Sequence, residues 1–194
     1  MSQNADPMAG GTVSIDTDAG FWVFAYGSLM WNPGFDAAES VLATLDGYHR
    51  SFCMASIVYR GTPEAPGLVL ALDRQRRASC AGVAYRVAPG NGAADCLAYL
   101  RERELVSSAY VEVLEPLALA DGRRVEALCY VMDRAHEQYR GALSLGSQAE
   151  IIARAEGPAG SNRDYLLNTV RSLHDLGLED PDLFDLADRV RRLP

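Results

Sequence analysis

Hydrophobic positions along the chain follow a strand-like pattern first and a helical pattern later. Residues 21–26, FWVFAY, are apolar throughout and rich in aromatic side chains, which is typical of a fully buried strand. Further apolar runs bounded by turn residues predict strands at 41–45, 51–58, 68–72, 82–87, 110–114 and 125–132. The predicted turns include Asp46-Gly47 and the segment 60–67, RGTPEAPG.

The helical period appears in four segments. Apolar residues recur at helical spacing in 93–104, 147–156, 161–173 and 181–193. Ser161 with Asp164 three residues later fits a capping box, and Pro181 suits the first turn of a helix. Strands followed by helices predict an α+β fold, with a mixed β-sheet or small β-barrel flanked by helices.

Length and composition indicate one domain. The 194 residues are 48% hydrophobic, and no linker rich in proline, glycine and serine separates two apolar blocks. The first twenty residues, MSQNADPMAGGTVSIDTDAG, form no apolar pattern. We therefore expect a mobile tail at 1–20 and a single domain at 21–194.

Charge and hydropathy exclude several classes of partner. A net charge of −8 argues against sequence-independent binding to nucleic acid, and the arginines at 74–77 are too few to make a binding stripe. No segment approaches the roughly 18 to 20 apolar residues of a membrane-spanning helix. The N-terminus shows neither the basic nor the apolar region of a signal peptide. We expect a cytoplasmic protein that binds neither nucleic acid nor membranes.

The cysteines do not form a metal site. Cys53, Cys80, Cys96 and Cys129 are widely spaced, and the three histidines supply no close ligand pair. We expect no bound metal, and thiols that are reduced and mostly buried.

One helix directs a carboxylate toward its own apolar side. At about 100° of rotation per residue, the helix at 93–104 places Ala93, Leu97 and Leu100 on one stripe, and the next position on that stripe is Glu104. Partial desolvation and the negative end of the helix dipole both raise the pKa of such a carboxyl. A carboxyl tuned toward neutrality suits a general acid/base.

The pattern also allows a purely structural interpretation of this glutamate. Glu102 points away from the stripe, where a surface carboxylate belongs. Since helix ends are uncertain by a couple of residues, the helix can equally fray after Arg103, leaving Glu104 to pair with an arginine.

The end of the first predicted strand also allows two interpretations. The apolar run stops at Tyr26 and passes directly into Gly27-Ser28, which is either an ordinary turn or a backbone loop that a rigid strand delivers to a ligand. Ser28 is not part of a nucleophile elbow of the G-x-S-x-G type, and no histidine constellation supports a serine nucleophile.

Four segments together resemble a known family. YGSLMWNPGF at 26–35, YRGTPEAPGLVLALD at 59–73, RELVSSAY at 103–110 and GPAGSNRDYL at 157–166 are similar, in order and spacing, to the hallmark segments of ChaC-type γ-glutamylcyclotransferases. The resemblance extends from about residue 21 to residue 190. It implies a γ-glutamylcyclotransferase-like fold, a small β-barrel-like sheet flanked by helices, with neither a metal nor an organic cofactor.

The resemblance also implies an activity and a set of site residues. In this branch of the family the substrate is glutathione, which is cleaved to 5-oxoproline and Cys-Gly. The family's catalytic glutamate falls on Glu104, and the tyrosine that follows it falls on Tyr110. The family's γ-glutamyl-binding loop falls on Tyr26, Gly27, Ser28 and Leu29.

Several assignments stay open at this point. Tyr26 and Tyr110 either contact substrate through their hydroxyls or are core tyrosines with satisfied hydroxyls. Arg60 either lines the mouth of a pocket or belongs to a structural turn fixed by Pro63 and Pro66.

One departure from the family pattern concerns the substrate. Family members often carry glycine before the tyrosine, where this chain has Ser107-Ser108-Ala109. Loss of glycine stiffens or reshapes a loop, so other γ-glutamyl amines or amino acids are an alternative class of substrate. A non-catalytic regulatory protein that binds a γ-glutamyl ligand is a second alternative. The oligomeric state does not follow from the sequence.

Overall fold

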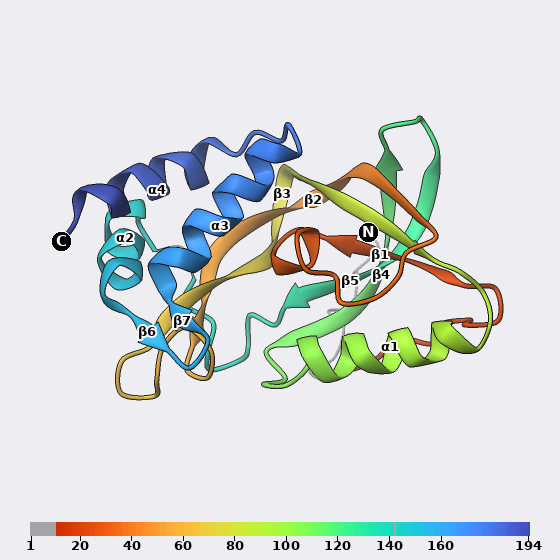
Figure 1. The fold of residues 1–194 in the computed structure, drawn as a ribbon, viewed down its shortest axis with the longest axis horizontal. Helices are drawn as coiled ribbons and strands as arrows, with labels where there is room; N and C mark the ends of the chain where they lie inside the picture. Colours follow the sequence, from red (N-terminus) through yellow and green to blue (C-terminus); the bar gives the residue numbers. More distant parts are fainter. Residues whose placement is uncertain (1–10, 142) are drawn as a thin grey trace, which may run out of the picture.

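A closed barrel of five strands forms the centre of the protein. The computed structural model describes residues 11–141 and 143–194. The barrel strands are β1 (Phe21–Ala25), β2 (Glu39–Ser56), β3 (Gly67–Val87), β4 (Tyr110–Leu119) and β5 (Arg124–Met132). They are arranged in the order β1-β3-β2-β4-β5, and a parallel pairing of β1 with β5 closes the barrel (Figure 1). The predicted barrel-like mixed sheet is confirmed.

Two long strands replace four predicted short ones. The runs at 41–45 and 51–58 fall in β2, which ends at Ser56, and those at 68–72 and 82–87 both fall in β3. The prediction that Asp46-Gly47 ends a strand was wrong. Gly47 has φ +84°, and the pairing register shifts between Asp46 and Tyr48, so a β-bulge carries the strand onward. The middle of β3 was missed because residues 74–77 are exposed and polar.

Four helices flank the barrel, as predicted. They are α1 (Asn91–Glu104), α2 (Leu145–Arg154), α3 (Asn162–Asp175) and α4 (Pro181–Arg192). Figure 1 shows α2, α3 and α4 gathered at one end of the barrel, with α1 on the other side. The predicted cap at Ser161 is present, since its hydroxyl accepts a hydrogen bond of 3.0 Å from the Asp164 amide.

The hydrophobic core has two parts. One cluster draws its buried side chains from the barrel strands and from Tyr26, which directly follows β1. Phe24 and Leu72 are among them, and the cluster fills the barrel interior. The other cluster joins the outward-facing strand residues to all four helices. Since successive strand residues face opposite sides, Phe24 belongs to the interior cluster and Ala25 to the outer one.

The N-terminal segment contacts the barrel where it is described. Of the tail predicted at 1–20, residues 1–10 lie outside the described part of the chain. Further along, the Val13 amide donates to Glu112 Oε2 at 3.0 Å, and the Val13 carbonyl accepts from Arg101 Nη2 at 2.8 Å. Arg101 and Glu112 also pair with each other at 2.8 Å, which ties this segment to α1 and β4.

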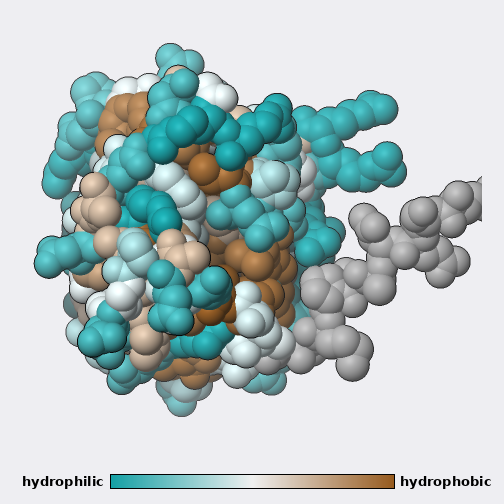
Figure 2. All heavy atoms as spheres, turned by 90° about the vertical axis from the view of Figure 1, so that its right-hand side faces the viewer, coloured by the Kyte–Doolittle hydropathy of each residue, from teal (hydrophilic) through white to brown (hydrophobic). Residues whose placement is uncertain are grey.

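The described surface is mixed in character. None of the helices in the described ranges is long and apolar enough to cross a membrane. On the face drawn in Figure 2, hydrophobic residues gather in patches that hydrophilic side chains interrupt. Such mixing is ordinary for a folded protein, whose accessible surface always retains much apolar area.

Close backbone contact holds the loop between β2 and β3 in place. This loop packs against a small hairpin of β6 (Glu156–Gly157) and β7 (Gly160–Ser161). A Cβ added at Gly157 would lie 2.5 Å from both the Gly61 nitrogen and the Tyr59 carbonyl oxygen. Neither atom belongs to a flexible side chain, so only glycine fits at this position.

Substitution of Gly157 tests this contact. Because the added methyl forces two backbones apart, we expect Gly157→Ala to lower the free energy of unfolding by about 1 to 3 kcal/mol. Gly92→Ala is the control, since it lies in α1 with no atom within 4 Å of an added Cβ. The control should raise stability by up to about 1 kcal/mol. Urea denaturation measures both, and a Gly157→Ala protein as stable as wild type would contradict the close packing.

Candidate active site

A cavity of about 410 Å³ opens beside the end of β1 and the end of α1. The 3₁₀ helix η1 (Ser28–Met30) forms one wall, and the C-terminal turn of α1 lies opposite. The cavity is lined by Tyr26, Gly27, Ser28, Leu29, Trp31, Asn32, Met54, Tyr59, Arg60, Val69, Leu70, Arg103, Glu104, Val106, Ser107, Tyr110, Tyr130, Ala159 and Tyr165. All seven residues predicted to form the site therefore lie on one cavity.

Glu104 is the last residue of α1, and its side chain is 15% exposed. Ala93, Leu97 and Leu100 are buried on the same helix, and Glu102 is exposed, as the helical period predicts. Burial raises the pKa of the Glu104 carboxyl above its ordinary value, and the neighbouring Arg103 offsets part of that shift. The helix extends through Glu104. Glu104 pairs with an arginine, as the structural interpretation expects, and it also lines the cavity.

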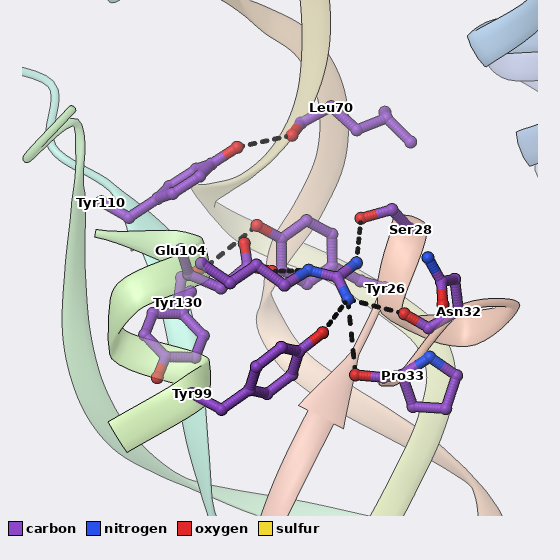
Figure 3. Close-up of polar contacts among 10 residues, drawn as sticks. Tyr26, Ser28, Asn32, Pro33, Leu70, Tyr99, Glu104, Tyr110 and Tyr130 are labelled. Atoms are coloured by element: carbon purple, nitrogen blue, oxygen red, sulfur yellow. Dashed lines mark hydrogen bonds and ion pairs between the residues drawn. The ribbon is translucent and has the colours of Figure 1, made fainter. Parts of the chain in front are cut away.

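Arg103 connects the glutamate to the opposite wall (Figure 3). Its Nε lies 3.1 Å from Glu104 Oε1. Its Nη2 donates to Ser28 Oγ at 3.0 Å, and its Nη1 donates to the Asn32 carbonyl at 2.7 Å and to the Tyr99 hydroxyl at 2.9 Å. One guanidinium therefore fixes the spacing between the carboxylate and the loop after β1.

That loop presents unpaired backbone amides. The Met30 amide donates back to the Gly27 carbonyl at 2.9 Å, which forms the 3₁₀ turn. The amides of Gly27, Ser28 and Leu29 donate to no acceptor within the part of the chain that the structure describes. Since all three residues line the cavity, this segment offers hydrogen-bond donors to an anionic or carbonyl oxygen.

Two buried tyrosines, Tyr26 and Tyr110, and the partly buried Tyr165 border the cavity. The Tyr26 hydroxyl donates to the Tyr130 carbonyl at 3.1 Å, and the Tyr110 hydroxyl donates to the Leu70 carbonyl at 2.8 Å (Figure 3). Burial raises the pKa of Tyr26, Tyr110 and Tyr165, so all three are neutral near pH 7. The two predicted tyrosines thus have satisfied hydroxyls and also line the cavity.

Arg60 is a second arginine, besides Arg103, that lines the cavity. Its guanidinium carbon lies 5.4 Å from the centre of the Tyr165 ring, and its Nη1 donates to the Ser161 carbonyl at 3.3 Å. It makes no salt bridge with any residue that the structure describes. The turn that follows it is structural, because Thr62 and Ala65 hydrogen-bond to each other.

Several lining residues were absent from the predicted site. Arg103 and Tyr165 lie inside the segments RELVSSAY and GPAGSNRDYL, so the sequence carried a signal for both that was not used. Tyr130 and Met54 come from ordinary strand positions, and no local pattern singles them out.

The described part of the chain offers little for metal or thiol chemistry. No group of three or more ligating side chains is found there. All four cysteines are free and buried, and burial raises the pKa of Cys53 to about 12 and that of Cys80 to about 11. These thiols are protonated near pH 7, as expected of structural cysteines.

Comparison with known proteins identifies the family. The sequence profile of the ChaC-like protein family matches residues 21–193. The chain belongs to this family. It is 39% identical over 183 residues to the glutathione-specific gamma-glutamylcyclotransferase of Escherichia coli, covering 94% of this chain and 78% of that protein.

Further relatives extend the similarity. The human glutathione-specific gamma-glutamylcyclotransferase 1 is 31% identical over 193 residues, covering 97% of this chain and 86% of that protein. The crystal structure of the yeast gamma-glutamyl cyclotransferase specific to glutathione superposes with a TM-score of 0.82 at 23% identity, covering 90% of this chain and 96% of that chain. The structural match establishes a shared fold.

The loop that follows α1 adopts at Ser108 a conformation that favours glycine. Ser108 has φ +55°, in the left-handed region, and its amide closes a turn on the Leu105 carbonyl at 3.1 Å. A side chain at such a position costs roughly 1 kcal/mol or more. The chain thus forms a left-handed turn here with serine at the strained position.

Paired substitutions test the strain at Ser108. We expect Ser108→Gly to raise the free energy of unfolding by up to about 1 kcal/mol, because the strain exceeds the added entropy of the unfolded chain. The neighbouring Ser107 does not have a positive φ, so Ser107→Gly should lower stability by about 0.5 to 1 kcal/mol. Thermal and urea unfolding measure both variants. If the free energy of unfolding changes with the same sign in the two, Ser108 is not strained.

Proposed function

We propose that this protein is a γ-glutamylcyclotransferase that cleaves glutathione to 5-oxoproline and Cys-Gly. The observation that carries the proposal is the buried Glu104 carboxyl, held by Arg103 across the cavity from unpaired amides at Gly27, Ser28 and Leu29. The names of the relatives in bacteria and animals support the choice of glutathione.

The chemistry is an intramolecular ring closure. The substrate's own α-amine attacks its γ-carbonyl carbon, a five-membered lactam forms, and the bond from that carbon to the cysteinyl nitrogen breaks. An α-amino group titrates near pH 8, so it is largely protonated at neutral pH and cannot attack in that form. Glu104 accepts a proton from the amine and delivers one to the leaving nitrogen, so no water is consumed.

The loop positions the substrate for this closure. Backbone amides at Ser28 and Leu29 bind the α-carboxylate or the developing oxyanion, and the small Gly27 allows close approach. Holding amine and carbonyl in a near-attack geometry contributes several kcal/mol, as much as the proton transfer or more. Tyr26 and Tyr110 contact the γ-glutamyl part, whereas Arg60 lies where the leaving part of the substrate exits.

A second substrate class is favoured by one observation. Ser107 and Val106 line the cavity, and Val106 is 57% exposed, so the mouth on this side is open and little constrained. Other γ-glutamyl amines or amino acids therefore fit the same chemistry. Comparing kcat/KM for glutathione with that for γ-glutamyl amino acids separates the two classes.

Replacement of the glutamate tests the central role. We expect Glu104→Gln to reduce kcat with glutathione by at least about 100-fold, because the amide cannot accept the proton, while substrate binding persists. Glu102→Gln is the matched control, as it makes the same chemical change two residues earlier on an exposed face and should keep wild-type activity. Mass spectrometry of 5-oxoproline and Cys-Gly measures turnover.

Three outcomes would count against this assignment. Wild-type protein that forms neither product from reduced glutathione removes the proposed activity. An equal loss of kcat in the Glu102→Gln and Glu104→Gln variants would show that Glu104 has no special role. A cellular effect that survives Glu104→Gln unchanged would favour the non-catalytic regulatory protein instead.

The pH profile tests the environment of Glu104. Its base form is the active one, so kcat/KM falls as pH drops through its pKa. Because burial raises that pKa, the acid limb should lie above the ordinary glutamate value of 4.5. Arg103 lowers the pKa, so Arg103→Met should move the midpoint to higher pH, whereas Arg103→Lys keeps the charge and leaves it near wild type. An acid limb that does not move in Arg103→Met would contradict this account.

A further inference from the structure

A buried arginine lies behind the loop, outside the cavity. Arg50 belongs to β2, its side chain is 2% exposed, and it is not among the residues that line the cavity. Its Nη1 donates to the Tyr26 carbonyl at 2.8 Å and approaches Met30 Sδ at 3.8 Å, while its Nη2 donates to the Ala81 carbonyl. One guanidinium thus joins the start of the loop, η1 and β3.

The charge of this arginine has a single carboxylate partner in the described part of the chain. Asp180 Oδ2 lies 3.0 Å from Arg50 Nε, and Asp180 Oδ1 accepts from the Leu183 amide at 3.2 Å as the N-cap of α4. Burial raises the pKa of Asp180, and Arg50 counteracts the shift. One carboxylate oxygen of Asp180 therefore caps α4, and the other pairs with the Arg50 guanidinium.

The hydrogen bond to Tyr26 determines which way the next amide points. The peptide bond is planar and trans, so the Tyr26 carbonyl and the Gly27 N–H point in opposite directions. The carbonyl is directed at Arg50, on the side away from the cavity, while Gly27 itself lines the cavity. The Gly27 N–H has no acceptor within the described residues.

We infer that Arg50 and Asp180 are positioning residues that fix the Tyr26–Gly27 peptide with its N–H directed into the cavity, toward an anionic oxygen of the substrate. This inference rests on the proposed function for the identity of the substrate. It assigns the start of α4, at the far end of the chain, a part in shaping the substrate-binding loop.

Asparagine at position 180 keeps an oxygen that can cap α4 and removes the negative charge that pairs with Arg50. Its carbonyl oxygen still caps α4, since asparagine and aspartate are both strong N-caps. Its NH₂ group then faces Arg50 Nε, and two donors cannot bond to each other. The buried guanidinium loses its counter-charge and moves to find another acceptor, which releases the Tyr26 carbonyl.

The test compares Asp180→Asn with Asp182→Asn. Asp182 lies in the same first turn of α4, is exposed and forms no hydrogen bond or ion pair with Arg50, so its substitution matches the change in charge and helix-end electrostatics. At a temperature where circular dichroism shows each variant fully folded, we expect Asp180→Asn to lower kcat/KM for glutathione by about 10- to 100-fold. The Asp182→Asn variant should match wild type, and the acid limb of the pH profile should stay in place in both.

A second readout does not depend on turnover. In ¹⁵N-labelled protein without ligand, the amide resonances of Gly27 and Ser28 should shift in Asp180→Asn and not in Asp182→Asn. If Asp180→Asn does not fold, Arg50→Lys takes its place, because it keeps the buried cation but cannot span Tyr26 and Ala81 together. The same fall in kcat/KM for glutathione and the same shifts of the Gly27 and Ser28 amide resonances are then expected.

The outcomes separate this inference from the proposed function. Wild-type protein that does not convert glutathione refutes the function, and the resonances alone then decide the inference. A folded variant with lowered melting temperature, wild-type kcat/KM and unshifted Gly27 and Ser28 resonances shows that the pair is only structural and overturns the inference.

Discussion

The site depends on the contacts of one guanidinium, that of Arg103. It lies between a carboxylate at the end of α1 and a loop at the end of β1, and it contacts both within hydrogen-bond distance. Without it, burial alone would favour a neutral Glu104, and the carboxyl would lose its hydrogen-bonded link to the loop. The ion pair thus serves two needs of the proposed proton-transfer site. It lowers a pKa that burial alone raises, which favours the base form of Glu104, and it links that carboxyl to the loop at Ser28.

The barrel and its helices supply the rigidity around this contact. β1 is paired on both sides, with β3 and with β5, so the loop that follows Ala25 starts from a fixed point. Arg50 and Asp180 fix the back of that loop, and Tyr165 of α3 closes the cavity from the side of the C-terminal helices. The C-terminal third of the chain thereby contributes to a cavity whose mostly buried carboxyl, that of Glu104, comes from α1.

Local patterns in the sequence predict part of this arrangement. The helical period brings Glu104 onto the apolar side of α1, and the abrupt change from Tyr26 to Gly27 marks the loop. The continuity of β2 and β3 does not follow from apolar runs, because a glycine bulge and an exposed arginine stretch interrupt them. The pairing of Arg50 with Asp180 joins residues far apart in sequence, and packing in three dimensions decides such pairs.

The central claim is that Glu104 faces the α-amine of a γ-glutamyl substrate while the loop amides bind its oxygens. A crystal structure of the Glu104→Gln protein with glutathione tests it most directly. The account predicts the α-amino nitrogen within hydrogen-bond reach of the side-chain amide at position 104, about 2.6 to 3.2 Å, with the α-carboxylate or the γ-carbonyl oxygen on the amides of residues 27–29. Glutathione bound in the opposite sense, with its glycine carboxylate on those amides and its α-amine toward Arg60, would contradict it.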